Sequence, residues 1–132
     1  MKVIPQLRVA RPSNDLERLL PFYRDGLGFE LLAGFEDHNG WDGIMLGHPH
    51  WPYHLEFTRH HDDQRAPRAP TPDHLIVFYI PDRDDWQRLL RRMFEAGFNQ
   101  VSSVNPYWDA HGATFEDPDG YRVVLYNGVW SK

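Results

Sequence analysis

The sequence predicts an α+β fold of two tandem β-α-β-β-β modules, whose strands form a curved, mostly antiparallel sheet that walls a cup, with the helices on the outer face. Two observations favour it. The order strand, helix, three strands occurs on each side of a polar stretch at residues 59–72 that contains three prolines. Residues 16–20 and 86–90 also match each other, as do 28–29 and 97–98. Such a repeat indicates an internal duplication.

The 132 residues are therefore expected to form one domain. The first half spans about residues 1–58, the linker 59–72 and the second half about 73–132.

The first half opens with a strand at residues 6–10, where apolar and polar residues alternate. Asn14, with Glu17 three residues later, predicts the N-cap and capping box of a helix at 16–23. Pro21 should kink this helix or end its first part. Gly26 and Gly28 then end it. Strands are predicted at residues 29–33, 44–46 and 53–58, with a turn region at 34–40.

The second half repeats this order, beginning with a strand at residues 73–80. Asp82 is the expected N-cap of the next helix, which Gly97 ends. Short strands are predicted at 100–103, 113–115 and 122–126, and residues 117–120 have the Asp-Pro-Asp-Gly chemistry of a turn.

Composition and charge disfavour or exclude several classes of function and of site. Hydrophobic residues make up 41% of the chain and aromatic residues 14%, which is enough for one core. The net charge of −5 disfavours nucleic-acid binding, which needs a basic face. No apolar run is long enough to span a membrane and the first residues do not resemble a signal peptide, so a cytoplasmic protein is expected. The absence of cysteine excludes disulfides, thiolate zinc sites and a cysteine nucleophile.

Alternation along the predicted strands separates a core face from a cup face. The core face is expected to hold Leu7, Val9, Leu55, Phe57, Leu75, Val77, Tyr79, Val123 and Leu125. The cup face then holds Gln6, Arg8, His54, Glu56, Thr58, His74, Ile76, Phe78, Arg122, Val124 and Tyr126. This mixture of charge, imidazole and aromatic rings suits a ligand pocket better than a solvated surface.

Residues 14–18 running into 22–29 resemble the first helix of the vicinal oxygen chelate superfamily, which comprises glyoxalase I, bleomycin-resistance proteins and extradiol dioxygenases. Residues 115–122 look like its final hairpin, and 73–75 like its second-half first strand. The resemblance covers nearly the whole chain and implies the glyoxalase-like fold. It implies less about chemistry, since the superfamily includes lyases, dioxygenases and drug-binding proteins without catalysis.

In metal-dependent members, four ligands come from the first and fourth strands of each half. Placed by motif, these positions are Arg8, Glu56, His74 and Val124 here. Val124 has no donor atom, and the Arg8 guanidinium puts a fixed positive charge where a cation would sit. The favoured interpretation is therefore an Arg8–Glu56 ion pair in place of the metal, with no cofactor.

An alternative set of His54, Glu56 and His74 would suit a divalent metal such as Zn, Ni, Fe or Mn. The chain would then be a metal-dependent lyase or dioxygenase that uses Glu56 and His74. His54, Glu56 and His111 are the candidates for a catalytic role.

The leading hypothesis is a small-molecule-binding protein of this superfamily, active as a homodimer, as is common in this fold. The arginines would meet an anionic or carbonyl group, and the aromatic residues, including two from the loop at 105–111, would contact a flat apolar part. The expected ligand-binding residues are Arg8, His54, Glu56, His74, Phe78, Tyr107, Trp108, Arg122 and Tyr126.

Overall fold

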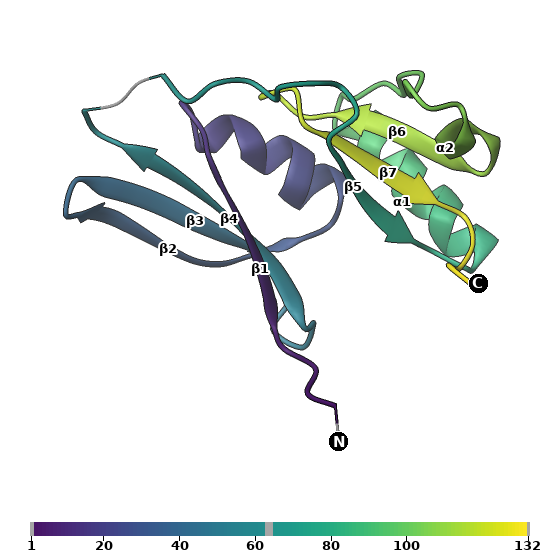
Figure 1. Ribbon diagram of the computed structural model, residues 1–132, viewed down its shortest axis with the longest axis horizontal. Helices are drawn as coiled ribbons and strands as arrows, with labels where there is room; N and C mark the ends of the chain where they lie inside the picture. Colours follow the sequence, from purple (N-terminus) through teal and green to yellow (C-terminus); the bar gives the residue numbers. More distant parts are fainter. Residues whose placement is uncertain (1, 63–64, 132) are drawn as a thin grey trace.

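The computed structural model describes residues 2–62 and 65–131, so positions 63 and 64 of the predicted linker lie outside the described residues. The first half forms one four-stranded sheet and two short helical segments (Figure 1). Its elements are β1 (Leu7–Pro12), η1 (Glu17–Leu19), η2 (Pro21–Gly26), β2 (Glu30–His38), β3 (Trp41–Gly47) and β4 (Tyr53–His60).

The second half forms a three-stranded sheet with one long helix beside it (Figure 1). Its elements are β5 (Leu75–Tyr79), α1 (Arg83–Glu95), α2 (Tyr107–Ala110), β6 (Gly112–Glu116) and β7 (Arg122–Tyr126). None of the helices in the described part of the chain is long and apolar enough to cross a membrane.

The two sheets repeat one topology. The strand order is β1-β4-β3-β2 in the first and β5-β7-β6 in the second. In each sheet the first strand lies at an edge, parallel to the last strand, and the remaining pairs are antiparallel. The predicted strand at 100–103 is reduced to a single bridge from Val101 to Thr114. The α+β class is thus confirmed, with the strands divided between two sheets.

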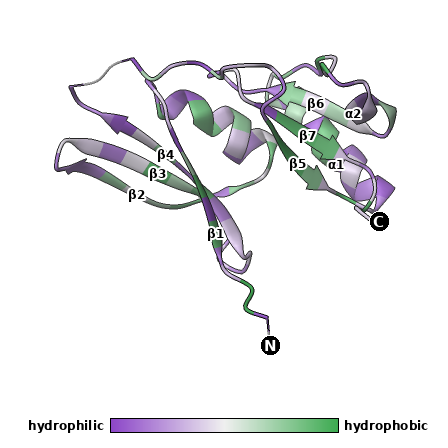
Figure 2. Cartoon of the chain, in the orientation of Figure 1, coloured by the Kyte–Doolittle hydropathy of each residue, from purple (hydrophilic) through white to green (hydrophobic). Residues whose placement is uncertain are grey.

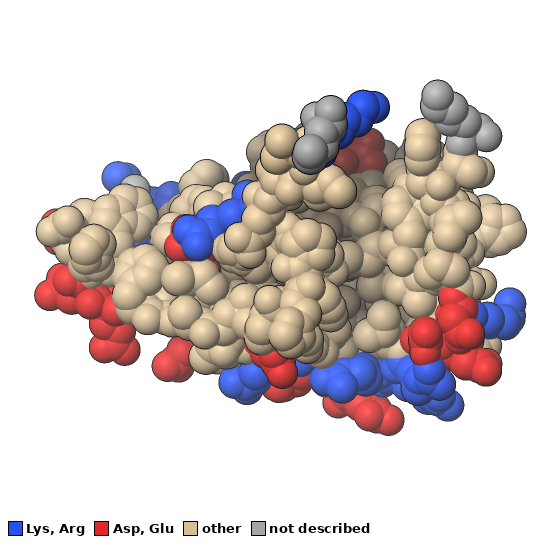
Figure 3. All heavy atoms as spheres, turned by 90° about the horizontal axis from the view of Figure 1, so that it is seen from below, with Lys and Arg blue, Asp and Glu red and all other residues tan. Residues whose placement is uncertain are grey.

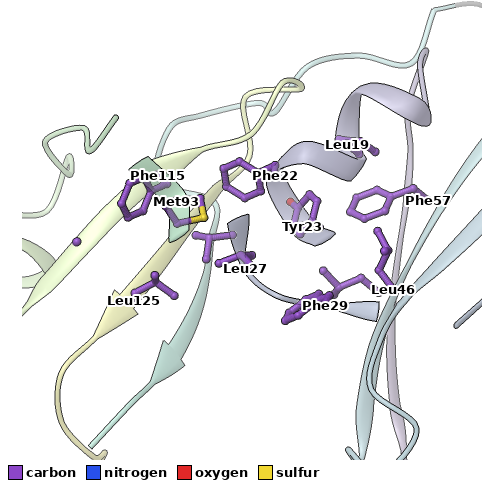
Figure 4. Close-up of a cluster of buried hydrophobic side chains, with 13 residues drawn as sticks. Leu19, Phe22, Tyr23, Leu27, Phe29, Leu46, Phe57, Met93, Phe115 and Leu125 are labelled. Carbon is purple, nitrogen blue, oxygen red and sulfur yellow. The ribbon is translucent and has the colours of Figure 1, made fainter. Parts of the chain in front are cut away.

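The hydrophobic core lies between the two halves and is shared by them. Phe22 and Tyr23 of η2 are fully buried between Phe57 of the first sheet and Phe115 of the second (Figure 4). Met93 of α1 is fully buried in the same cluster. Hydrophobic residues run along β5 and β7, whereas hydrophilic residues gather toward the ends of β2 and β4 (Figure 2). One core therefore holds η2 and α1 between the two sheets. The helices were predicted on the outer face of the cup, and it is this face of each sheet that packs against the shared core.

Pro21 divides the helix predicted at residues 16–23 into two segments, as expected. Pro21 begins η2, which is π-helical, after the short 3₁₀ turn of η1. Asn14 does not cap this segment: its side chain accepts a hydrogen bond from the Ala66 amide at 2.7 Å and donates one to the Ala66 carbonyl at 3.2 Å. The Asp15 carboxylate instead accepts from the Arg18 amide at 3.3 Å. Asn14 therefore fastens the linker to the first half.

Candidate functional site

Three polar side chains meet on the face of the first sheet that is turned away from the core. Arg8 of β1 is paired with His54 of β4, and Glu56 lies two residues further along β4. The Arg8 guanidinium donates from Nε to His54 Nε2 at 2.8 Å and from Nη1 to Glu56 Oε2 at 3.4 Å. The Arg8–Glu56 contact expected from the sequence is therefore present. We call these three residues the polar row.

The polar row is half open to solvent, with 48% of the Arg8 side chain and 14% of the Glu56 side chain exposed. A pair so exposed contributes little to stability, typically ~0–1 kcal/mol. Because Nε2 of His54 accepts from Arg8, a neutral His54 carries its proton on Nδ1. The row thus holds the guanidinium in place while about half of the Arg8 side chain stays exposed.

An aromatic cluster lies on the corresponding face of the second sheet, and it contains three of the predicted ligand-binding residues. Tyr126 of β7 is at its centre, with ring centroids 6.2 Å from Tyr107, 6.0 Å from Trp108 and 6.2 Å from His111. A hydrogen bond with the Tyr107 side chain raises the pKa of Tyr126 above its ordinary value, and partial burial adds to this effect. The cluster presents stacking surface and hydroxyl donors together.

Tyr79 belongs to this aromatic cluster, although strand alternation predicts it on the core face. Its ring is 5.5 Å from Tyr126, its register partner, and 40% of the residue is exposed. All five residues of β5 are apolar or aromatic, so alternation did not reveal which of them face the core. The register between β5 and β7 would have revealed it, because paired residues of neighbouring parallel strands point to the same face of the sheet and Tyr79 is paired with Tyr126.

For the same reason, the prediction that Phe78 and Ile76 face the cup is wrong. Both pack against the core. The Phe78 ring lies 5.7 Å from Phe29 and 5.9 Å from Tyr53.

Arg122 lies at the start of β7 but is engaged elsewhere. Its guanidinium donates to Glu116 Oε1 at 3.2 Å and to the Ser102 carbonyl at 3.0 Å, and 14% of its side chain is exposed. These contacts tie the β6–β7 hairpin to the preceding loop.

The alternative metal set is not brought together. His74 precedes β5, and its Nδ1 lies 2.9 Å from the Thr71 hydroxyl. His54 and Glu56 belong to the first sheet, whereas His74 precedes the first strand of the second sheet. The register differs as well: Arg8 is paired with His54, two residues before Glu56, whereas the residue paired with Arg122, two residues before Val124, is Leu75. His74 thus falls one position away from the equivalent of Arg8.

Within residues 2–62 and 65–131, no three His, Cys, Asp or Glu side chains gather closely enough to hold a metal ion. Glu56 is bonded to Arg8, and Val124 is fully buried without a donor atom. The described donor set therefore does not fit the divalent metal that many members of the superfamily use.

Comparison with known proteins identifies the family. Residues 7–58 match the YycE-like N-terminal domain, and residues 73–127 match the YycE-like C-terminal domain. YycE of Bacillus subtilis (strain 168), an uncharacterized protein, is 43% identical over 122 residues, which cover 92% of this chain and 87% of YycE. The crystal structure of B. subtilis YycE, described as a protein of unknown function, has a TM-score of 0.85 at 41% identity and covers 96% of this chain and 91% of that one.

More distant structures share the fold, and they confirm the glyoxalase-like fold that the sequence predicted. Glyoxalase I of Leishmania major has a TM-score of 0.70 at 21% identity, covering 96% of this chain and 88% of its own. The fosfomycin resistance protein FosX of Mesorhizobium loti has a TM-score of 0.69 at 15% identity, covering 97% and 94%. The chain belongs to the YycE-like family, within the vicinal oxygen chelate superfamily of glyoxalases and antibiotic-resistance proteins.

Proposed function

We propose that this protein binds a small organic molecule that has an anionic or carbonyl group and a flat apolar part, and that it does so without a metal. The observation that carries the proposal is the Arg8 guanidinium, held by His54 and Glu56 and still half exposed on the outer face of the sheet. A fixed guanidinium with free donors suits a carboxylate, a phosphonate or a polarised carbonyl.

The aromatic cluster supplies the second half of this proposed site. Tyr79, Tyr107 and Trp108 offer partly exposed rings and Tyr126 a hydroxyl, the combination common in pockets that orient a planar ligand. Within one chain, however, the polar row and the aromatic cluster belong to different sheets, with the shared core between them (Figures 1 and 4).

A homodimer resolves this separation. In the proposed assembly the polar row of one copy faces the aromatic cluster of the other, so that two cups form. The edge positions of β1 and β5 support this arrangement, because each leaves a strand to which a second copy can be added. Structural neighbours described as fosfomycin or bleomycin resistance proteins, and one described as an antibiotic-binding protein, suggest the scale of the ligand, a small natural or antibiotic-like compound.

The test is a thermal-shift screen of small carboxylates, phosphonates and carbonyl compounds, with calorimetry on any compound that stabilises the protein. Arg8→Ala and Tyr107→Ala should each weaken binding by about tenfold or more, as expected for loss of a charge-assisted hydrogen bond or a stacked ring. Arg18→Ala is the matched control, since Arg18 is an exposed arginine of η1, away from the polar row.

Sedimentation equilibrium of the same proteins completes the experiment. A ligand whose affinity is equal in the parent and Arg8→Ala, or a protein that binds its ligand fully as a monomer, would contradict the proposed site.

A further inference from the structure

A cavity lies on the core side of the first sheet, where the two halves meet. It is bounded by the chain between η2 and β2, the β3–β4 loop, the end of β5 and α1. Its volume is about 660 Å³, within the ~300–1,000 Å³ typical of small-molecule sites. We call it the aromatic groove. The β3–β4 loop and the end of β5 lie at the lower side of Figure 1, and seen from below this side is mostly uncharged and hollowed between two lobes (Figure 3).

Four rings form one wall of the groove and contact one another in a closed circuit. Phe29 lies 5.5 Å from Trp51 and 5.7 Å from Phe78, edge to face in both cases. Tyr53 is stacked on Trp51 at 5.5 Å and lies 5.9 Å from Phe78. Such mutual packing fixes the ring planes, so the wall is ready to accept a planar ligand without reordering its side chains.

Arg92 is the one charged residue among those that line the groove. Its Nε donates to the Gly26 carbonyl at 3.3 Å, and its Nη2 donates to the Asp25 carbonyl at 3.1 Å. These carbonyls end η2 and fix the guanidinium. Within the described residues, Arg92 forms no ion pair with an acid, and its Nη1 makes no hydrogen bond. A positive charge therefore stands beside the aromatic wall with a donor to spare.

From this pairing of a ring-lined wall with one unneutralised guanidinium, we propose that the aromatic groove is a second small-molecule site, which takes a planar aromatic compound bearing a single negative charge, such as an aromatic carboxylate. A cationic ligand is disfavoured because no acidic residue lines the groove. The hydroxyl of Tyr53 and the indole N–H of Trp51, which make no hydrogen bonds within the described part of the chain, add donors for a polar substituent.

This site is separate from the polar row. Tyr53 shares a strand face with Leu55 and Phe57, which are buried in the core. His54 and Glu56 point to the opposite face of the same strand. A compound in the groove and a compound at the polar row therefore lie on opposite sides of the first sheet. Tyr79 of the aromatic cluster also lines the groove, so the substitutions expected to separate the two sites are those of Arg8 and Arg92.

The experiment uses 2-naphthoate as the probe, with neutral 2-naphthylmethanol and cationic 2-naphthylmethylamine for comparison, each titrated by calorimetry into the intact protein. The parent should bind the naphthoate about tenfold or more tightly than either comparison compound. Arg92→Gln should reduce the naphthoate affinity by about ten- to a hundredfold and leave the affinity for the alcohol unchanged. The matched control is Arg91→Gln, which removes a charge from the neighbouring exposed position of α1.

Since Arg92 also holds the end of η2, its variant is checked by circular dichroism, and Trp51→Leu provides an independent variant that removes stacking area. Amide shifts in NMR spectra should map the probe to Gly28, Trp51 and Leu89. Equal binding of the three probes by the parent, or an equal loss in Arg91→Gln, would overturn the proposal. It would also fall if Arg8→Ala weakened naphthoate binding as much as Arg92→Gln did, because the probe would then lie at the polar row. Dissociation of a dimer in step with probe binding would instead assign the groove to a second copy of the chain.

Discussion

At the scale of single residues, Arg8 places a fixed positive charge on the outer face of the first sheet. Its guanidinium lies at hydrogen-bonding distance from both His54 and Glu56, the two side chains nearby with atoms that bind metals well. A divalent cation at this place would meet a fixed positive charge. The same charge would attract the anionic ligand that we propose. In the proposed function, this one side chain occupies the place of the metal and is the group that meets the ligand.

Replacing that charge should open a metal site. Arg8→His puts a third donor beside Glu56 and beside His54, the residue paired with position 8. The three side chains would then form the two-histidine, one-carboxylate set that suits zinc or nickel. We expect added zinc or nickel to raise the melting temperature of Arg8→His and not that of the parent. Metal at 100 times its dissociation constant stabilises a folded protein by ~2.7 kcal/mol.

Two further substitutions control this melt. In the Arg8→His background, His54→Ala should abolish the stabilisation, whereas His74→Ala should preserve it, since His74 is bonded to Thr71 before β5. Equal stabilisation of the parent by metal would show that Arg8 does not block the site.

Much of the candidate site followed from residue types and alternation alone. Arg8, His54 and Glu56 stand on strands whose alternating pattern is clear, and Tyr107, Trp108 and Tyr126 were marked by their exposed aromatic chemistry. His74, Phe78 and Tyr79 were misplaced because β5 is apolar throughout, so its register with β7, a long-range property, determines which side chains face outward.

At the scale of elements, local sequence predicted the structure correctly where a short motif forms a helix cap or a turn. Asp82 caps α1 as expected, and its carboxylate accepts from the Asp85 amide at 2.9 Å. The turn at 117–120 closes through the Gly120 amide and the Asp117 carbonyl at 3.0 Å. Local reasoning failed for β2, which continues to His38 through the predicted turn, because pairing with β3 across two irregularities outweighs the local turn preference.

The cap of α1 yields a direct prediction. Asp82→Ala removes the acceptor for the Asp85 amide and should lower the free energy of unfolding by ~1 kcal/mol. Asp82→Asn keeps a good N-cap and should lose only a small part of this. Urea unfolding of the three proteins measures the difference; if the alanine and asparagine variants were equally destabilised, the charge of Asp82, rather than its capping bond, would be the cause.

At the scale of the whole molecule, the two halves are joined by a buried polar contact as well as by the core. The Tyr23 hydroxyl of η2 donates to Asp117 Oδ2 at 2.6 Å, and Oδ1 of the same carboxylate accepts from the amides of Asp119 and Tyr121 at 2.8 and 3.0 Å. Arg11 of β1 lies over the Tyr121 ring, 3.9 Å from its centroid. The final turn of the second half is thereby fixed against the first half.

Burial raises the pKa of the Asp117 carboxyl above its ordinary value, although the hydrogen bonds from Tyr23, Asp119 and Tyr121 oppose the shift. Burial, and then the nearby Asp117 carboxylate, raises the pKa of Tyr23 well above 10. A group whose pKa is higher in the folded state binds its proton more tightly there than in the unfolded chain. Its contribution to stability is therefore complete below the unfolded pKa, ~3.9 for Asp, and is lost as the pH rises through the folded value.

Asp117→Asn removes this titration while keeping an oxygen that accepts from the two backbone amides. We expect the free energy of unfolding of the parent, minus that of Asp117→Asn, to increase as the pH falls from 7 to below 4. The reason is that only the parent has a carboxyl at position 117, and this carboxyl binds its proton more tightly in the folded state than in the unfolded chain. Each unit by which folding raises the pKa corresponds to ~1.4 kcal/mol of this increase. Urea unfolding at a series of pH values measures it, and Asp84→Asn, at an exposed position of α1, controls for the general effect of one fewer acid. A difference that shrank on acidification would mean that the Tyr23 and backbone hydrogen bonds outweigh burial at Asp117, and that the contact between the halves favours the carboxylate over the acid.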